Sequence, residues 1–122
     1  MQGFLKGTEN STQLLKINLG AVRMILEAAM LNVKEGMESE FEQAFAEASS
    51  IIASKKGYIE HELQRCMEDV GKYLLLVRWQ TLEDHTIGFR QSAEYENWKK
   101  LLHHYYDPFP TVEHFKSVYI SK

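Results

Sequence analysis

Two residues in the second half of the chain have side chains suited to acid–base chemistry and to anion binding. His85 lies on the apolar side of an expected short helix, where burial lowers the pKa of an imidazole and leaves it able to accept a proton. Arg90 carries a planar guanidinium that can hold a phenolate or a carboxylate. We therefore predict His85 and Arg90 as catalytic residues. A core histidine bonded to the backbone and a surface ion pair are the respective alternatives.

Aromatic side chains near these two residues are candidates for the wall of a binding site. Flat rings stack on one another, so such a wall would suit a flat aromatic molecule. The predicted substrate-binding residues are Tyr58, His61, Trp79, Phe89 and Trp98. Ordinary core packing is the alternative for the aromatic residues, and an edge or interface position is the alternative for His61.

The remaining histidines do not match a metal site. His103 and His104 are neighbours on an expected helix, so their side chains diverge by about 100° and cannot chelate one ion together. His61 and His114 fall on strands expected at opposite edges of the sheet. The sequence also lacks a glycine-rich phosphate loop, a nucleophile elbow and a paired-cysteine motif, and we expect no metal.

Hydrophobic periodicity predicts the elements that position these residues. Residues 25–33 form an apolar run with only Glu27 and Asn32 as polar breaks, which indicates a strand buried on both faces. Residues 37–54 have the spacing of an amphipathic helix, with acidic residues in its first turns. Residues 58–66 and 72–79 read as a strand hairpin, because turn residues separate them.

The sequence pattern in the second half of the chain predicts two helical segments and one more strand. Thr81 and Asp84 resemble a capping box that begins a short helix carrying Leu82, His85 and Phe89 on one side. Ser92 is suited to cap a second segment that runs to His104. Two prolines then end the helix, and residues 111–119 alternate as a last strand.

This order of elements predicts an α+β, ferredoxin-like βαββαβ fold with a four-stranded antiparallel sheet and both helices on one face. Two helices shield one face only, whereas residues 25–33 and 72–79 are apolar on both sides. We therefore expect a homodimer in which a second copy covers the other face. The aromatic, proline-containing loop at residues 105–109 would either clasp that partner or close over a ligand.

Length and composition narrow the classes of protein. A chain of 122 residues has room for one domain, which we place at residues 24–122, with residues 1–23 as an N-terminal extension. Its 14 Lys and Arg against 17 Asp and Glu, with no basic block, disfavour a nucleic-acid partner. No apolar stretch approaches the roughly 20 residues of a membrane helix. The single cysteine, Cys66, is expected to be a small buried hydrophobe in a cytoplasmic protein.

Several segments resemble the antibiotic biosynthesis monooxygenase (ABM) family, a group of dimeric α+β barrels. The resemblance covers residues 24–119. It rests on the LLLVRW strand that ends at Trp79, on Phe89-Arg90-Gln91-Ser92 followed by Tyr95 and Trp98, and on the tail from His103 through DPFPTVEHF. The family is held together by core spacing rather than by an invariant catalytic string, so its fold transfers more securely than its chemistry.

The resemblance implies oxygenation of a small, electron-rich aromatic, of the quinol or polyketide phenol type, by dioxygen without a metal or organic cofactor. The site would lie between the sheet and its helices. A non-catalytic barrel that binds small molecules or takes part in a stress response is the alternative. Haem binding or degradation has less support, because the three positions of the family's haem-degrading residues hold Ala29, Phe89 and Lys99.

Overall fold

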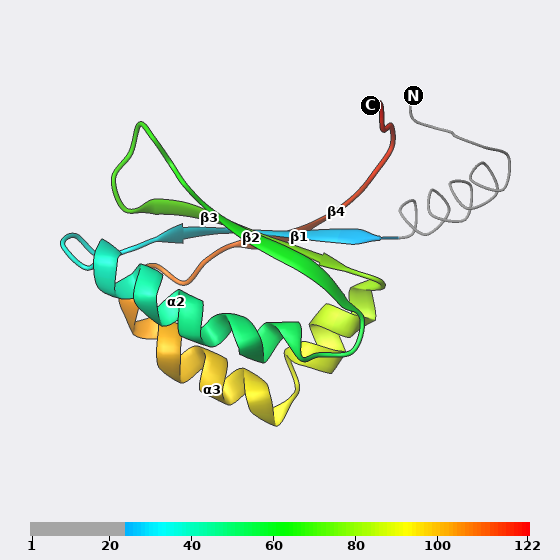
Figure 1. Cartoon of the computed structure of the whole chain (residues 1–122), viewed down its shortest axis with the longest axis horizontal. Coiled ribbons are helices and arrows are strands. Elements are labelled where there is room, and N and C mark those ends of the chain that lie inside the picture. Colours follow the sequence, from blue (N-terminus) through cyan, green and yellow to red (C-terminus); the bar gives the residue numbers. More distant parts are fainter. Residues whose placement is uncertain (1–23) are drawn as a thin grey trace, which may run out of the picture.

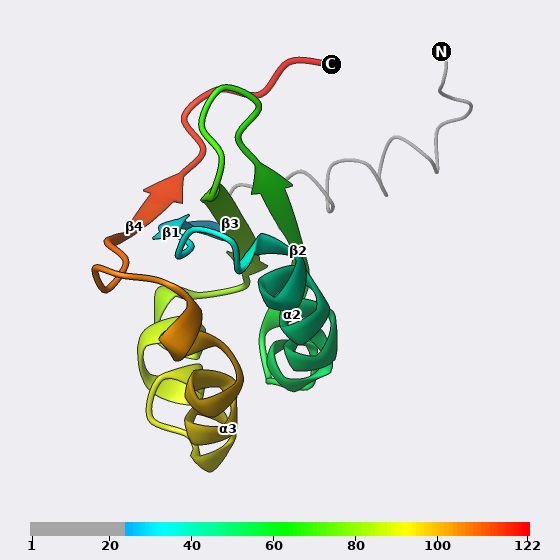
Figure 2. The same ribbon diagram turned by 90° about the vertical axis from the view of Figure 1, so that its left-hand side faces the viewer.

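Four strands form one antiparallel sheet, and the helices cover only one of its faces (Figures 1 and 2). The computed structural model describes residues 24–122, so the expected extension at residues 1–23 lies outside the described residues. The spatial order of the strands is β2-β3-β1-β4. The strands are β1 (Ile25–Asn32), β2 (Tyr58–Arg65), β3 (Lys72–Trp79) and β4 (Val112–Lys116). The predicted α+β, ferredoxin-like βαββαβ fold is confirmed.

The helical elements lie together beneath the sheet (Figure 2). They are α2 (Glu38–Ala53), the π-helix η1 (Asp84–Phe89), α3 (Ala93–Leu102) and the 3₁₀-helix η2 (His103–Tyr105). None of the helices in residues 24–122 is long and apolar enough to cross a membrane.

The two central strands supply the core of the sheet. On β1, Ala29 and Leu31 point toward the helices, and Leu75 and Val77 do so on β3. The register pairs Ala29 with Leu75, so their side chains fill one layer. Phe41, Phe45, Ala48 and Ile52 of α2 pack against this layer at the helical spacing predicted for residues 37–54.

The opposite face of the sheet is open in the single chain. Burial of β1 on both faces was expected, but the alternate side chains of this strand are only partly covered, and Met30 is 38% exposed. Phe115 on β4 is also exposed on this side, and Leu26, Leu74 and Leu76 are half-buried. This face therefore carries a connected group of apolar side chains that the helices do not reach.

Gly57 and a capping box fix where η1 begins. Gly57 has φ of +83°, and a Cβ there would lie 2.0 Å from Asp84 Oδ2, so only glycine fits. The Thr81 backbone N–H donates to Asp84 Oδ2 over 3.2 Å, and the Asp84 N–H donates to Thr81 Oγ1 over 3.1 Å. The predicted capping box is confirmed, and it anchors the segment that carries His85.

The short helix after this box has a wider turn than expected. The Arg90 N–H donates to the His85 carbonyl over 3.0 Å, a five-residue step that defines a π-helical turn. Within this turn His85 and Phe89 are buried. Leu82, which was expected on the same side, is 40% exposed. The π-turn thus directs two rings, rather than three side chains, toward the sheet.

Two further expectations are corrected. Cys66 was expected to be buried, but it follows β2 in the hairpin and is only half-buried. The last strand was expected over residues 111–119, but β4 ends at Lys116. Lys116 pairs with Ile25, the first residue of β1, so the strand beside β4 offers no further partner.

Ser92 joins the end of η1 to the start of α3. As predicted, it caps α3: its Oγ accepts a hydrogen bond from the Tyr95 N–H over 3.2 Å and donates one to the Phe89 carbonyl over 2.7 Å.

We predict that Ser92→Ala lowers the free energy of unfolding by about 1 kcal/mol, because the substitution leaves both the Tyr95 N–H and the Phe89 carbonyl without this partner. Chemical denaturation would measure the change. Ser50→Ala is the matched control, since Ser50 is exposed within α2, and it should change stability by less than about 0.5 kcal/mol. Equal effects of the two substitutions would contradict the capping role.

Candidate functional site

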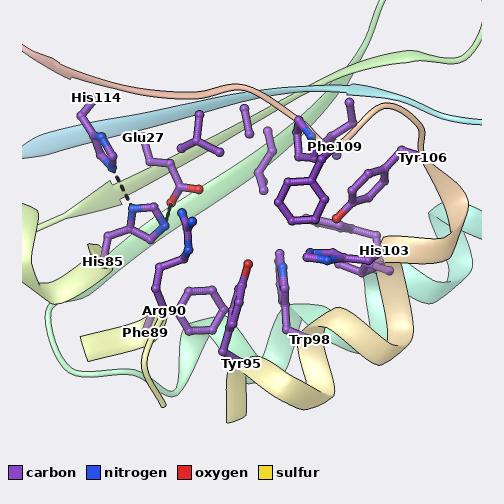
Figure 3. A pocket seen from close by; sticks show the side chains of 17 residues that line it. Glu27, His85, Phe89, Arg90, Tyr95, Trp98, His103, Tyr106, Phe109 and His114 are labelled. Carbon is purple, nitrogen blue, oxygen red and sulfur yellow. Dashed lines mark hydrogen bonds and ion pairs between the residues drawn. The ribbon is translucent and has the colours of Figure 1, made fainter. Parts of the chain in front are cut away.

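A cavity of about 260 Å³ lies between the sheet and the helices, beneath β1, β3 and β4 (Figure 3). Its polar lining residues are Glu27, His85, Arg90, Tyr95, His103 and His114. Its aromatic lining residues are Phe45, Phe89, Trp98, Tyr106 and Phe109. Glu27, His85, Arg90 and His114 gather at one end of the cavity (Figure 3), and aromatic and aliphatic side chains make up most of the remaining wall.

Glu27 is a buried carboxyl at the polar end of the cavity. It is 5% exposed, and the Trp79 indole Nε1–H donates a hydrogen bond to its Oε1 over 2.9 Å. Burial raises the pKa of Glu27 from 4.5 to about 7, although the bond from Trp79 and the charge of Arg90 act in the opposite direction. Glu27 therefore changes its protonation state near neutral pH, unlike an ordinary surface glutamate.

His85 lies directly beside this carboxyl and is 1% exposed. Its Nε2 is 3.4 Å from Glu27 Oε1, its Nδ1 is 2.8 Å from His114 Nε2, and its ring stacks on Trp79 with an interplanar angle of 21°. Burial is the largest cause that lowers the pKa of His85 to about 3, followed by His114 and the charge of Arg90. His85 is consequently a neutral imidazole at physiological pH.

Arg90 follows η1 and extends along the cavity wall toward Glu27 (Figure 3). Its guanidinium carbon lies 5.7 Å from the centroid of the Tyr95 ring, a distance typical of a cation–π contact. The residue as a whole is exposed, so its positive charge faces both the cavity and solvent. An anionic group of a ligand would meet this charge on entering the polar end.

The aromatic wall is held by edge contacts between rings. Phe89 packs against Tyr95 at 5.1 Å and against Trp98 at 5.5 Å between centroids, in both cases nearly perpendicular. At the other end, Phe109 is 63% exposed and packs edge-on against His103 at 4.8 Å. The loop that carries Phe109 therefore forms part of the cavity wall.

The structure brings together most of the residues predicted from the sequence. His85, Phe89, Arg90 and Trp98 line the cavity, and Trp79 lies next to it with its indole on Glu27.

Tyr58 and His61 do not line this cavity. The Tyr58 hydroxyl and Ser49 Oγ both make hydrogen bonds to the His61 ring, which fastens β2 to α2. His61 packs against the edge of Phe45 at 5.8 Å, so it lies behind the wall rather than in it.

Sequence reasoning missed Glu27 and His114. Glu27 was treated as a polar interruption of an apolar strand. The alternation of side chains along the strand could have revealed it, because Glu27 lies on the same face as Ala29 and Leu31. An acidic side chain on a buried face requires a partner. His114 was considered only as a metal ligand, and the register places it directly opposite Glu27 on the neighbouring strand.

Among residues 24–122, no group of three or more His, Cys, Asp or Glu side chains is arranged to hold a metal ion. Of the three positions compared with haem-degrading proteins, Ala29 and Phe89 line the cavity, and Lys99 does not. Neither lining residue offers a polar group to a haem or its oxygen.

Comparisons with known proteins assign the chain to a family. The model of the antibiotic biosynthesis monooxygenase family matches residues 24–101. The chain is also 64% identical over 95 residues to an uncharacterised Bacillus subtilis protein, YczJ. The aligned residues make up 78% of this chain and all of that protein. The chain therefore belongs to the antibiotic biosynthesis monooxygenase family.

Solved structures agree with this assignment. A Bordetella bronchiseptica protein whose structure carries the family's name is 34% identical, with a TM-score of 0.76 over 79% of this chain and 98% of that one. A mutant of SnoaB, a cofactor-independent oxygenase from Streptomyces nogalater, is 16% identical, with a TM-score of 0.70 over 80% of this chain and 96% of that one. At this level of identity, the similarity to SnoaB shows a shared fold only.

We predict that the stability of Glu27→Gln relative to wild type increases as the pH rises. With its raised pKa, folded Glu27 keeps a proton that the unfolded chain releases above pH 4.5, so its contribution to stability falls as the pH rises through about 7. Between pH 4.5 and pH 8 this relative stability should increase by about 2–3 kcal/mol, from the 1.36 kcal/mol that each pKa unit represents.

Denaturant titrations at several pH values would measure this difference. His85 acts in the opposite direction between pH 3 and pH 6.5, so each variant is compared with wild type at the same pH. Glu113→Gln on β4 is the control, because Glu113 is exposed. A difference for Glu27→Gln that stays constant with pH would contradict the raised pKa.

Proposed function

We propose that this protein is a cofactor-independent monooxygenase that oxidises a small, electron-rich aromatic of the quinol or polyketide phenol type with dioxygen. The observation that carries the proposal is the buried Glu27 carboxyl beside a neutral His85, at the end of a cavity whose wall includes several aromatic rings. The family supports the reaction class, and the cofactor-independent oxygenase SnoaB has the same fold.

The reaction needs little from the protein beyond binding and proton removal. A deprotonated quinol or phenol is electron-rich enough to pass an electron to dioxygen itself. One oxygen atom enters the substrate, and the other leaves as water together with two hydrogens that the substrate gives up, so no external reductant is required. The protein must exclude water, orient the ring and accept a proton.

Each proposed role follows from where the side chain lies. Phe89 and Trp98 provide rings against which a flat substrate ring can pack, either stacked or edge to face. Arg90 stabilises the anion formed when the substrate loses its proton. The Glu27–His85 pair lies at the polar end, where the proton would be taken up, and Trp79 holds Glu27 in place. Tyr58 and His61 would act only indirectly, through Phe45.

We predict oxygen uptake when the purified protein, treated with a chelator, is mixed with a panel of hydroquinones and anthrones. Arg90→Ala should lower kcat/KM about tenfold to a hundredfold, because it removes a charged partner of the substrate anion worth roughly 1.5–3 kcal/mol. Arg65→Ala is the matched control, since Arg65 is exposed and pairs with Glu42 away from the cavity. An oxygen electrode measures all three proteins.

Uptake no faster than in buffer across the whole panel would overturn the proposed reaction. Tight binding of the same compounds without turnover would instead favour the non-catalytic barrel, which uses the cavity to carry or sense a ligand.

We also propose that a second copy of the chain covers the open face of the sheet. This face carries Leu26, Leu74 and Leu76 together with the exposed Met30 and Phe115. Contiguous apolar side chains of this kind are uncommon on the surface of a monomer and typical of an interface between copies.

We predict that Leu76→Glu converts the wild-type dimer to a monomer, because it would bury a carboxylate at the centre of the proposed interface. Light scattering at micromolar concentration measures the mass. Ile87→Glu is the matched control, since Ile87 is an exposed apolar residue on η1, among the helices beneath the sheet. A wild-type protein that is already monomeric would contradict the proposal.

Cys66 supports the proposal that the protein works in the cytoplasm. A single cysteine cannot form an internal disulfide bond, and proteins of reducing compartments generally lack such bonds. Its thiol is half-buried in the hairpin rather than near the cavity, so it has no part in the proposed chemistry.

A further inference from the structure

We propose that Glu27 takes the substrate's proton and that His85 and His114 conduct it from the cavity to the β4 edge of the sheet. This inference rests on the proposed function, since it assigns the path of the proton that the reaction must remove. The three side chains come from three separate elements, β1, η1 and β4, and they form one continuous line (Figure 3).

The fold fixes the two ends of this line. Glu27 and His114 are paired across the β1–β4 register, and both side chains point to the helix side of the sheet. His85 reaches them from η1, with one ring nitrogen 3.4 Å from Glu27 Oε1 and the other 2.8 Å from His114 Nε2. Stacking on Trp79 holds the His85 ring in this bridging orientation.

Charges around the line favour transfer through neutral histidines. Burial and the charge of Arg90 lower the pKa of His114, and burial does the same more strongly for His85. The titratable and charged groups that face Glu27 are His85 and Arg90 from the η1 segment, His114 from β4, and Tyr95 and His103 across the cavity. Positive charge on either bridging histidine is therefore disfavoured, and Glu27 is the member that titrates near neutral pH.

A neutral imidazole has one nitrogen that donates and one that accepts, which is what a relay requires. With Glu27 protonated, its O–H donates to His85 Nε2, and His85 Nδ1–H donates to His114 Nε2. One proton then crosses each contact, and His114 releases its Nδ1 proton to water. Glu27 is left ionised, and both histidines are left neutral in the opposite tautomer.

The end of the line is suited to release. β4 is an edge strand, and His114 is half-buried, whereas Glu27 and His85 are 5% and 1% exposed. His114 also lines the cavity, and because it lies on the edge strand and is more exposed than Glu27 or His85, a proton that reaches it can pass to solvent. The 3.4 Å contact between His85 and Glu27 is long for a hydrogen bond, so it must shorten by a few tenths of an ångström for transfer.

The first test uses the protein without substrate. In nitrogen-15 NMR spectra, the Trp79 indole signal of the wild-type protein should shift with a midpoint near pH 7, as Glu27 loses its proton. The ring nitrogens of His85 and His114 should exchange tautomers at the same midpoint. In Glu27→Gln both changes should disappear. Tautomers that stay fixed while the Trp79 signal titrates would overturn the relay.

The second test separates conduction from packing. His114→Gln keeps a side chain that can bond to His85 but cannot pass a proton, so kcat should fall about tenfold or more with KM unchanged. His114→Ala should show the same loss, and free imidazole should restore it. A purely structural role predicts instead that glutamine preserves kcat, and that result would overturn the proposal.

His104→Ala is the matched control, since His104 is exposed and does not line the cavity, and it should leave kcat unchanged. Glu27→Gln should lower kcat/KM by about a hundredfold or more, as expected for loss of a general base. Absence of turnover with every substrate would refute the proposed function. The tautomer exchange, measured without substrate, tests the relay independently of that outcome.

Discussion

Removal of the Glu27 carboxyl from water is the physical constraint on which the site depends. A carboxylate in an apolar strand is unfavourable unless it is neutralised or hydrogen-bonded, and here the Trp79 indole and the neighbouring His85 surround it. The raised pKa of Glu27 means that this carboxyl contributes less to the stability of the folded protein at neutral pH than at acidic pH. The presence of a carboxyl at this position is therefore better explained by a role in acid–base chemistry than by a contribution to core packing.

The rest of the fold holds this unfavourable group in place. β1 is paired on both sides, with β3 and with β4, so its backbone cannot shift to bring Glu27 to the surface. The π-turn of η1 presents the rings of both His85 and Phe89 to the sheet, and Ser92 ties the end of that turn to α3. Edge contacts among Phe89, Tyr95 and Trp98 keep the wall rigid, so the cavity beside the carboxyl stays open.

Local patterns predicted the elements well because each depends on nearby residues, as the Thr81–Asp84 box and the Ser92 cap show. Long-range placement was harder. An apolar run does not reveal which face meets the helices, so Glu27 was read as an interruption. The side chain of His61 points to the helix side of the sheet. A bulge between Tyr58 and Glu60 shifts the register of β2, so that His61 pairs with Val77 of β3. The strand order, by contrast, agrees with the expectation that the strands of His61 and His114 lie at opposite edges of the sheet.

The same long-range effects decide which residue serves as the base in the proposed reaction. From residue type alone, a histidine is the natural proton acceptor near pH 7. In this fold burial, His114 and Arg90 lower the pKa of His85 to about 3, and burial raises the pKa of Glu27 to about 7, so their ordinary order is reversed. Neighbouring groups whose pKa values are moved apart in this way commonly divide the acid–base work of a site. In the proposed reaction the carboxyl exchanges the proton, and the histidine, held neutral with both nitrogens engaged, connects it to the sheet edge.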